Sequence, residues 1–219
     1  AVLVAQPRCD RNIRRLEREL VLAYETGAKV AVVLTKADLA DDHETVEQVR
    51  SMVQARVGED CPTLVVSDQD PHSVEAVREL IPPETVAVFI GKSGVGKSSL
   101  VNLLVGEEVQ QTGRIREGDG RGRHTTVSRE MIELPGGGCV VDMPGVRGLG
   151  MWESDAGIGA AFSDIEEAAT LCRFRDCKHA GEPGCAVQAA VAEGRIAPER
   201  LASYQALKSE PHAVRERKE

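Results

Sequence analysis

Aromatic side chains are scarce in this chain, because Phe, Trp and Tyr together make up only 3% of its 219 residues. A hydrophobic core must therefore consist mainly of Val, Leu, Ile and Ala, and the apolar content of 42% is sufficient for one. A chain of this length is expected to form one domain, or one domain with an appendage.

Long hydrophobic runs are also missing. No apolar run approaches the ~20 residues that a membrane-spanning helix needs, and the first ten residues, AVLVAQPRCD, lack the basic start and long apolar stretch of a secretory signal. We therefore expect a cytoplasmic protein without membrane contact. The sequence starts with Ala rather than Met, and its first residues have the pattern of a strand, which we interpret as a fragment of a longer protein.

An excess of positive charge is absent as well. The formal net charge of −8 argues against a generally basic nucleic-acid-binding surface, although it leaves local basic patches open. Nothing indicates secretion, so a disulfide framework is disfavoured for the six cysteines. We interpret Cys9, Cys61 and Cys139 as ordinary packed thiols, because each lies in or beside an apolar or helical stretch.

Apolar runs and helical periodicities alternate over the first two thirds of the chain. Apolar runs predict strands at residues 1–5, 30–34, 63–67, 85–90, 128–134 and 139–143. Apolar residues at three- and four-residue steps predict helices at about residues 10–25, 46–57, 73–81 and 98–105. This alternation is typical of a doubly wound, mostly parallel α/β sheet.

The composition changes after about residue 151. Residues 160–208 contain no strand-like run and are rich in Ala and Glu, which predicts a small α-helical appendage. The last residues, AVRERKE, are charged and are expected to be frayed. We therefore predict a sheet domain over residues 1–155 and a helical domain with a charged C-terminal tail over residues 156–219.

The stretch GKSGVGKSS fits the phosphate-binding pattern G-x-x-x-x-G-K-[ST] in full, and it follows an apolar strand and opens a helix. The glycines let backbone N–H groups surround phosphate oxygens, Lys97 would reach the β- and γ-phosphates, and the Ser98 hydroxyl would bind Mg²⁺. The predicted nucleotide contacts are Gly91, Lys92, Ser93, Gly94, Val95, Gly96, Lys97, Ser98 and Ser99. Lys92 would touch phosphate or face solvent, and we favour solvent.

An acidic motif further along the chain fits magnesium binding. Asp142 ends an apolar strand and is followed by Pro144 and Gly145, which matches D-x-x-G. In this motif the Asp holds Mg²⁺ through water and the Gly N–H contacts the γ-phosphate. The stretch GRGRHTT at residues 120–126 offers Thr125 or Thr126 to complete the Mg²⁺ shell, and we favour Thr126; the alternative is a plain basic loop.

The stretch LTKADL at residues 34–39 contains T-K-x-D, a pattern that binds guanine. The Asp38 carboxylate can accept from the N1–H and the exocyclic amine of guanine, a donor pair that adenine lacks. Lys36 would pack its stem along the base, and Thr35 can hydrogen-bond to the phosphate loop. The next predicted strand ends at Ser67, where a GTPase places a backbone contact to the guanine O6.

The order of these motifs is unusual, because the base-binding motif precedes the phosphate loop by some fifty residues. A circular permutation explains this order without changing any contact, since the termini of a compact domain often lie close together. The alternative is that T-K-x-D is a chance match in a strand-end turn and that the chain binds ATP.

Three cysteines and a histidine are clustered with the spacing Cys172-x₄-Cys177-x-His179-x₅-Cys185. Three thiolates and one imidazole make a tetrahedral Cys₃His set, which is typical of structural zinc and leaves no open position for catalysis. A small helical domain would gain much of its stability from this metal. The alternative is two structural cysteines with chance neighbours, and the lack of C-x-x-C disfavours a redox role.

The motifs LTKADL, GKSGVGKSSLVN, GRGRHTT, DMPG and CRFRDCKHAGEPGC together resemble the circularly permuted, ribosome-small-subunit-dependent GTPases of the RsgA (YjeQ/YloQ) family, over essentially the whole chain. The resemblance implies an amino-terminal OB-fold, a permuted P-loop GTPase domain and a helical zinc-binding domain. The sequence has no part corresponding to the OB-fold, which supports the fragment interpretation. It also departs from the family pattern at Ser67, which lacks the expected Ala and Gly after it, and at Lys92.

The resemblance further implies slow GTP hydrolysis, stimulated by the small ribosomal subunit during its late maturation. Val146 follows D-x-x-G, where Ras-like enzymes carry a glutamine that orients the attacking water. We therefore expect that His124, or a group supplied by the ribosome, takes this role. The catalytic assignments are His124, Thr126 and Lys97.

The segment 112–124 carries the arginines Arg114, Arg116, Arg121 and Arg123. It is expected to order around the γ-phosphate and to contact rRNA phosphates, or else to be a solvated loop. The expected partners of a monomeric chain are GTP and GDP, the small ribosomal subunit and its rRNA. Two alternatives stay open: a nucleotide-gated rRNA-binding module with negligible turnover, and a permuted GTPase for another ribosomal assembly step.

Overall fold

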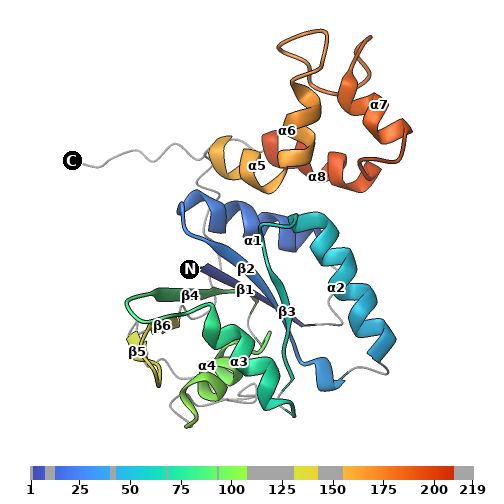
Figure 1. The fold of residues 1–219 in the computed structure, drawn as a ribbon. Helices are drawn as coiled ribbons and strands as arrows, with labels where there is room; N and C mark the ends of the chain where they lie inside the picture. Colours follow the sequence, from blue (N-terminus) through green and yellow to red (C-terminus); the bar gives the residue numbers. More distant parts are fainter. Residues whose placement is uncertain are drawn as a thin grey trace, which may run out of the picture. The chain divides into compact units, whose positions relative to one another are not determined.

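The computed structural model describes residues 2–7, 13–39, 43–67, 69–92, 94–107, 131–142 and 155–209. The chain forms two compact units (Figure 1). The sheet unit comprises residues 1–13 and 28–148, and the helical unit comprises residues 14–27 and 149–219. The predicted helix near the amino terminus thus groups with the C-terminal helices, whereas the predicted division at residue 155 places it with the sheet.

The sheet unit is built on parallel strands. Its strands are β1 (Val2–Pro7), β2 (Val30–Thr35), β3 (Thr63–Val65), β4 (Val86–Ile90), β5 (Met131–Glu133) and β6 (Cys139–Asp142). Across the described residues the sheet order is β3-β2-β1-β4-β6-β5. Neighbouring strands run parallel except β5 and β6, which pair antiparallel. This arrangement confirms the predicted α/β fold class.

Helices alternate with these strands along the chain. They are the short 3₁₀ helix η1 (Ala37–Leu39), α2 (His43–Val57), α3 (Pro71–Glu79) and α4 (Lys97–Val105). The Asp70 side chain accepts from the N–H of His72, and Pro71 takes the first position of α3, where its missing N–H costs nothing. Helices α3 and α4 pack side by side on the sheet (Figure 1).

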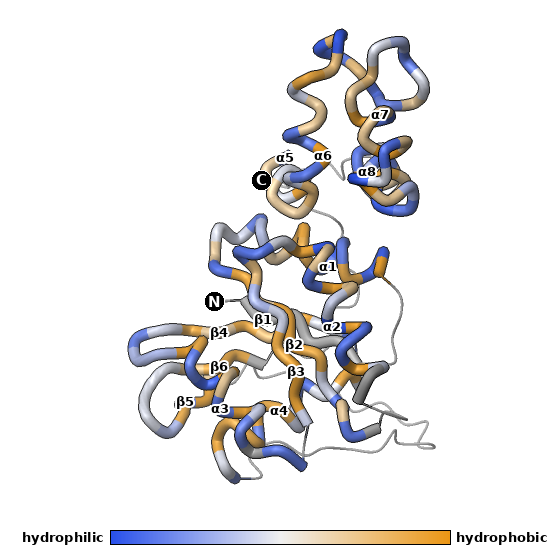
Figure 2. The backbone as a smooth tube through the Cα atoms, turned by 45° about the vertical axis from the view of Figure 1, so that its right-hand side comes forward, coloured by the Kyte–Doolittle hydropathy of each residue, from blue (hydrophilic) through white to orange (hydrophobic). Residues whose placement is uncertain are grey.

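The core of the sheet unit is aliphatic, as the scarcity of aromatics requires. Every residue of β2 is buried, which fits a strand covered on both faces, and the central strands are mostly hydrophobic in Figure 2. Under α3 and α4 the buried cluster combines strand residues such as Val33, Phe89 and Val140 with helix residues such as Val77 and Leu104. Burial of these side chains fixes the strands whose ends carry the predicted site.

The helical unit contains α1 (Ile13–Glu25), α5 (Asp155–Ala161), α6 (Ser163–Ala169), α7 (Ala186–Ala192) and α8 (Pro198–Ser209). No described helix is long and apolar enough to cross a membrane. The backbone of α5 lies directly against α1, because a Cβ added at Gly157 would come within 2.7 Å of the Val21 carbonyl oxygen. Glycine at this position therefore permits the close approach of the two helices.

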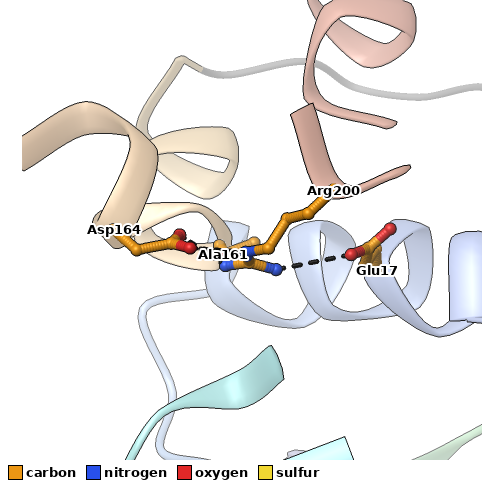
Figure 3. Close-up of polar contacts among 4 residues, drawn as sticks. All are labelled: Glu17, Ala161, Asp164 and Arg200. Carbon is orange, nitrogen blue, oxygen red and sulfur yellow. Dashed lines mark hydrogen bonds and ion pairs between the residues drawn. The ribbon is translucent and has the colours of Figure 1, made fainter. Parts of the chain in front are cut away.

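Arg200 of α8 makes polar contacts with residues of α1, α5 and α6 (Figure 3). Its guanidinium donates to both oxygens of Asp164, at 2.7 Å each, and to the Ala161 carbonyl at 2.9 Å. It also pairs with Glu17 of α1 at 3.3 Å and lies 4.8 Å above the centre of the Phe162 ring. Because Arg200 and Glu17 are 5% and 1% exposed, this interaction takes place away from water, where an unmatched charge is costly.

Tyr204, one turn further along α8, strengthens the same assembly. Its hydroxyl donates to the Glu166 carboxylate at 2.8 Å, and its ring packs edge-on against Phe162 with centroids 5.6 Å apart. Burial and the adjacent Glu166 carboxylate raise the pKa of Tyr204 to about 12. The hydroxyl therefore stays a neutral donor over the working pH range.

Replacement of Arg200 tests the contribution of its ion pairs with the buried Glu17 and the partly exposed Asp164. We expect Arg200→Met to reduce the free energy of unfolding by about 3–5 kcal/mol, because Glu17 and Asp164 lose their shared cation. Denaturant titration measures the change. Arg195→Met is the matched control: Arg195 pairs with Glu193 on the exposed surface, and its loss should cost less than about 1 kcal/mol. Equal effects of the two substitutions would contradict this assignment.

Candidate functional site

The two predicted nucleotide-binding motifs are in direct contact, through pairs of residues that lie 60 and 58 positions apart in the chain. The Thr35 hydroxyl donates to the Val95 carbonyl at 2.5 Å, and the Lys36 ammonium donates to the Gly94 carbonyl at 2.7 Å. The contact arises because β2 and β4 flank β1 in a parallel array, so that their carboxyl ends lie at one edge of the sheet. The base-binding motif is thus placed against the phosphate loop although it precedes that loop in the chain.

The glycine loop has the backbone that its sequence predicts. Gly94 and Gly96 have φ angles of +76° and +108°, which other residues rarely adopt. A Cβ at Gly96 would also lie 3.1 Å from the Thr35 hydroxyl oxygen, so that glycine is needed for the contact between the motifs. Gly96 caps α4, whose N-terminal N–H groups form a favourable place for an anion.

Lys97 turns its side chain back over this loop. Its ammonium donates to the carbonyl oxygens of Gly91 at 2.8 Å and Lys92 at 3.0 Å, and the residue is 7% exposed. These contacts hold the positive charge beside the loop and the start of α4. The Lys92 side chain itself is exposed, and Ser98 and Ser99 are half-buried in the first turn of α4.

Asp38 lies in η1, directly after Thr35 and Lys36. Among the described residues its Oδ1 is buried and has no hydrogen-bond partner. A buried acceptor without a donor costs free energy, about 1–3 kcal/mol. A guanine base, whose N1–H and amine are donors, could supply a partner here, as the sequence predicts.

Ser67 follows β3 at the same edge of the sheet. Its N–H donates to the Ser73 hydroxyl at 3.2 Å, and its own hydroxyl accepts from the Gln69 N–H at 3.2 Å. Ser73, in the first turn of α3, was missed by the sequence analysis, although a serine near a helix start is a common partner for a loop N–H. The Ser67 N–H is therefore already occupied by a protein acceptor.

Several predicted site residues fall outside the described part of the chain, among them Ser93, His124, Thr126 and Gly145. The arginine-bearing segment 112–124, Thr125 and Val146 fall outside it as well. Asp142 is described as the last residue of β6, paired in register with Phe89 of β4. The backbone of Asp142 therefore lies at the carboxyl ends of the parallel strands, where β4 leads into the glycine loop.

In the helical unit, the four predicted metal ligands converge. Their ligand atoms all lie within 4.8 Å of one another. The Cys172 sulfur lies 3.7 Å from His179 Nδ1 and 3.9 Å from the Cys185 sulfur, and the latter lies 3.4 Å from His179 Nδ1. A zinc ion with tetrahedral bonds of about 2.3 Å to sulfur and 2.0–2.1 Å to nitrogen requires separations of about 3.6–3.8 Å. The three printed separations are close to these values, and the Cys177 sulfur lies within 4.8 Å of the other ligand atoms, so the four residues could hold a metal ion.

The charges of the cluster also favour a cation. Burial and the neighbouring Cys185 and Cys172 sulfurs raise the pKa of Cys177 to about 12. Burial opposes ionisation of Cys172 too, but the backbone N–H groups of Val187 and Ala186 help to lower the pKa of its thiol. Three thiols this close cannot all ionise without a compensating positive charge, which a divalent metal would provide.

Strand, glycine loop and helix, with a base-binding motif against the loop, define a P-loop nucleotide-binding protein of the GTPase type with a permuted chain order. A family model described as RsgA GTPase matches residues 1–152. The chain belongs to the RsgA GTPase family, which confirms the resemblance found in the sequence.

Curated relatives and solved structures agree with this assignment. The "Small ribosomal subunit biogenesis GTPase RsgA 2" of Lactiplantibacillus plantarum is 44% identical over 201 residues, which are 92% of this chain and 55% of the relative. The protein of the same name from Vibrio parahaemolyticus is 46% identical over 202 residues, 90% of this chain and 54% of the relative. The chain therefore spans about half the length of these curated relatives.

Two solved structures share the fold. YjeQ from Thermotoga maritima superposes with a TM-score of 0.71 and 26% identity, over 96% of this chain and 72% of that chain. YloQ, described as a circularly permuted GTPase, superposes with a TM-score of 0.70 and 25% identity, over 94% of this chain and 66% of that chain. The permuted order of the motifs is thus a property of the fold.

Substitution of Asp38 tests the base-binding assignment. We expect Asp38→Asn to weaken GDP binding at least tenfold, because the amide offers a donor where guanine also presents donors. Binding of a xanthine nucleotide should improve, since its carbonyl replaces the guanine amine. Calorimetric titration with both nucleotides measures this. Asp70→Asn, at the cap of α3, is the matched control and should leave both affinities unchanged; unaltered GDP binding by Asp38→Asn would exclude the assignment.

Substitution of a ligand tests the metal centre. We expect one equivalent of zinc per chain, measured by elemental analysis, and a loss of this metal in Cys172→Ser. Unfolding of the helical unit should then begin at a lower temperature, because the metal contributes to its folding free energy. Cys139→Ser, on β6 and outside the cluster, should retain the metal. A full zinc equivalent in Cys172→Ser would contradict the ligand assignment.

Proposed function

We propose that this chain hydrolyses GTP to GDP and phosphate and acts as a nucleotide switch in the late maturation of the small (30S) ribosomal subunit. The observation that carries the proposal is the contact of Thr35 and Lys36 with the phosphate loop, beside the unsatisfied carboxylate oxygen of Asp38. A base and its phosphates can then be bound together. Membership of the RsgA GTPase family and the names of the relatives support the ribosomal role.

The nucleotide would be held by residues from both motifs. Asp38 accepts from guanine, with Thr35, Lys36 and the Ser67 region beside it. The phosphates lie against the loop, and the full set of contacts is Gly91, Lys92, Ser93, Gly94, Val95, Gly96, Lys97, Ser98, Ser99, Asp142 and Gly145. Lys97, already held over the loop by backbone carbonyls, places its charge next to the β- and γ-phosphates.

Magnesium would be bound by Ser98, Thr126 and Asp142, and it would neutralise charge on the phosphate oxygens. Thr126 and His124 are the proposed catalytic residues besides Lys97, with His124, or a ribosomal group in its place, orienting the attacking water. The zinc bound by the Cys₃His set has a structural role. We propose a cytoplasmic monomer whose partners are GTP, GDP, the small ribosomal subunit and its rRNA.

Nucleotide turnover by this chain tests the proposal. GTP hydrolysis is measured alone, with purified small subunits and with purified large subunits, and ATP is measured in parallel. We expect slow turnover alone, stimulation by small subunits only, and no use of ATP. Lys97→Ala should lose turnover about 100-fold or more, as expected when a charge that stabilises the transferred phosphoryl group is removed.

Two outcomes would contradict the proposal. Equal binding of GDP and ADP would exclude the guanine specificity. Selective GTP hydrolysis that small subunits do not stimulate would exclude the ribosomal part of the proposal for this chain, while the nucleotide site would stand.

A further inference from the structure

His179 has a backbone conformation that its side chain does not favour. Its φ angle is +57°, in the left-handed region that non-glycine residues rarely occupy, yet the residue is 4% exposed and directs Nδ1 at the Cys185 sulfur. Such a conformation persists only where the surroundings stabilise it. The hydrogen bonds around the segment 178–180 therefore decide whether this ligand is in place.

Glu182 holds the N–H side of this segment. One carboxylate oxygen accepts from the Lys178 N–H at 3.0 Å, and the other accepts from the Ala180 N–H at 2.8 Å. The backbone carbonyl of Glu182 accepts from the Cys185 N–H at 3.2 Å. A single residue thus holds the Cys177–Lys178 and His179–Ala180 peptide groups and the N–H of Cys185.

Two glutamines hold the carbonyl side. The His179 carbonyl accepts from the Gln188 amide at 2.6 Å and from the Gln205 amide at 2.9 Å, so that both its lone pairs are used. Gln205 also donates to the Lys178 carbonyl at 3.2 Å. Gln188 belongs to α7, where its N–H donates to the Cys185 sulfur at 3.4 Å, and Gln205 belongs to α8.

The position of Gln205 gives its hydrogen bonds particular weight. An open groove of about 660 Å³ is lined on one side by residues 177–180 and on the other by residues of α8, Gln205 included. A groove implies that the two sides are not closely packed along their length, so polar contacts across it contribute more to holding them together. The same helix carries Arg200, which pairs with Glu17 of α1.

We propose that Glu182, Gln188 and Gln205 are positioning residues of the metal centre, which fix the peptide groups on both sides of His179 in the ligating conformation and so set how long the metal is retained. The inference rests on the zinc site of the proposed function and adds residues that the ligand pattern does not contain. Hydrogen-bonded partners outside the ligand set commonly change metal affinity by about 10–100-fold.

Metal release from the full chain tests the proposal. The zinc-loaded protein is mixed with an excess of a chromogenic chelator, and the release rate is recorded for Glu182→Ala, Glu182→Gln and Gln205→Ala. We expect release about tenfold faster or more in Glu182→Ala and Gln205→Ala. Glu182→Gln should lie between these and the parent chain, because its amide oxygen retains one acceptor.

The cobalt-substituted protein provides a second measurement that a merely structural role would not change. The thiolate-to-cobalt and d–d absorption bands report the geometry of the ligand set, and both should shift or broaden in Glu182→Ala and Gln205→Ala. Glu199→Gln, an exposed carboxylate in the first turn of α8, is the matched control and should leave rate and spectrum unchanged. Cys177→Ser gives the reference for a lost ligand.

The outcomes separate this inference from the site itself. Parental release rates and cobalt spectra in all three variants would overturn the inference while the zinc site stands, and so would a lower melting temperature with both readouts unchanged. A parent chain that binds neither zinc nor cobalt would overturn the zinc assignment and the inference together.

Discussion

The contact between the Thr35 hydroxyl and the Val95 carbonyl, with that of Lys36 beside it, is the interaction on which the proposed nucleotide site depends. It joins the predicted base-binding motif to the glycine loop, two segments that follow β2 and β4 on either side of β1. Thr35 lies opposite Pro7 of β1 and Ile90 lies opposite Val4, so β2 extends three residues further along β1 than β4 does, and the loop after Ile90 spans this difference. The absence of a side chain at Gly96 then leaves room for the threonine. These contacts join the end of one strand to the loop that follows another strand. They do not depend on where the chain begins, so a permuted order preserves them.

In the helical unit, one helix, α8, carries most of the polar contacts that join its elements. Along α8, Arg200 pairs with Glu17 and Asp164, Tyr204 donates to Glu166, and Gln205 donates to the carbonyl of His179, a proposed metal ligand. The proposed metal centre and these ion pairs are therefore stabilised through a common helix. The chain passes between the two units at residues 13–14, 27–28 and 148–149. Since α1 lies between β1 and β2 in sequence, the helix that pairs with Arg200 is covalently continuous with the strands that lead to the nucleotide site.

Local sequence patterns predicted most of the secondary structure, because apolar runs and glycine positions act over a few neighbouring residues. The run VAVVL became β2, buried along its whole length, and the glycine loop adopted the left-handed angles that its glycines permit. Helix α3 begins at Pro71, two residues before the start that apolar periodicity predicts, because the Asp70 side chain caps the helix and Pro71 fits its first position. The antiparallel pairing of β5 was not foreseen, since a run of alternating residues does not encode the direction of its neighbour.

The sequence by itself determined the family of this protein, the permuted order of its motifs and the candidate residues of its sites, which are the glycine loop, Asp38 and the Cys₃His set. These features follow from residue types at short spacings, because residues that are close in the sequence are also held close together by the local backbone. Tertiary structure alone decided that α1 joins the C-terminal helices and that Gln205 of α8 donates to the His179 carbonyl. The partners of Glu17 and of His179 come from other helices, 183 residues and 26 residues away in the chain. No periodicity or motif spans such separations, because only the packing of the helices brings these groups together.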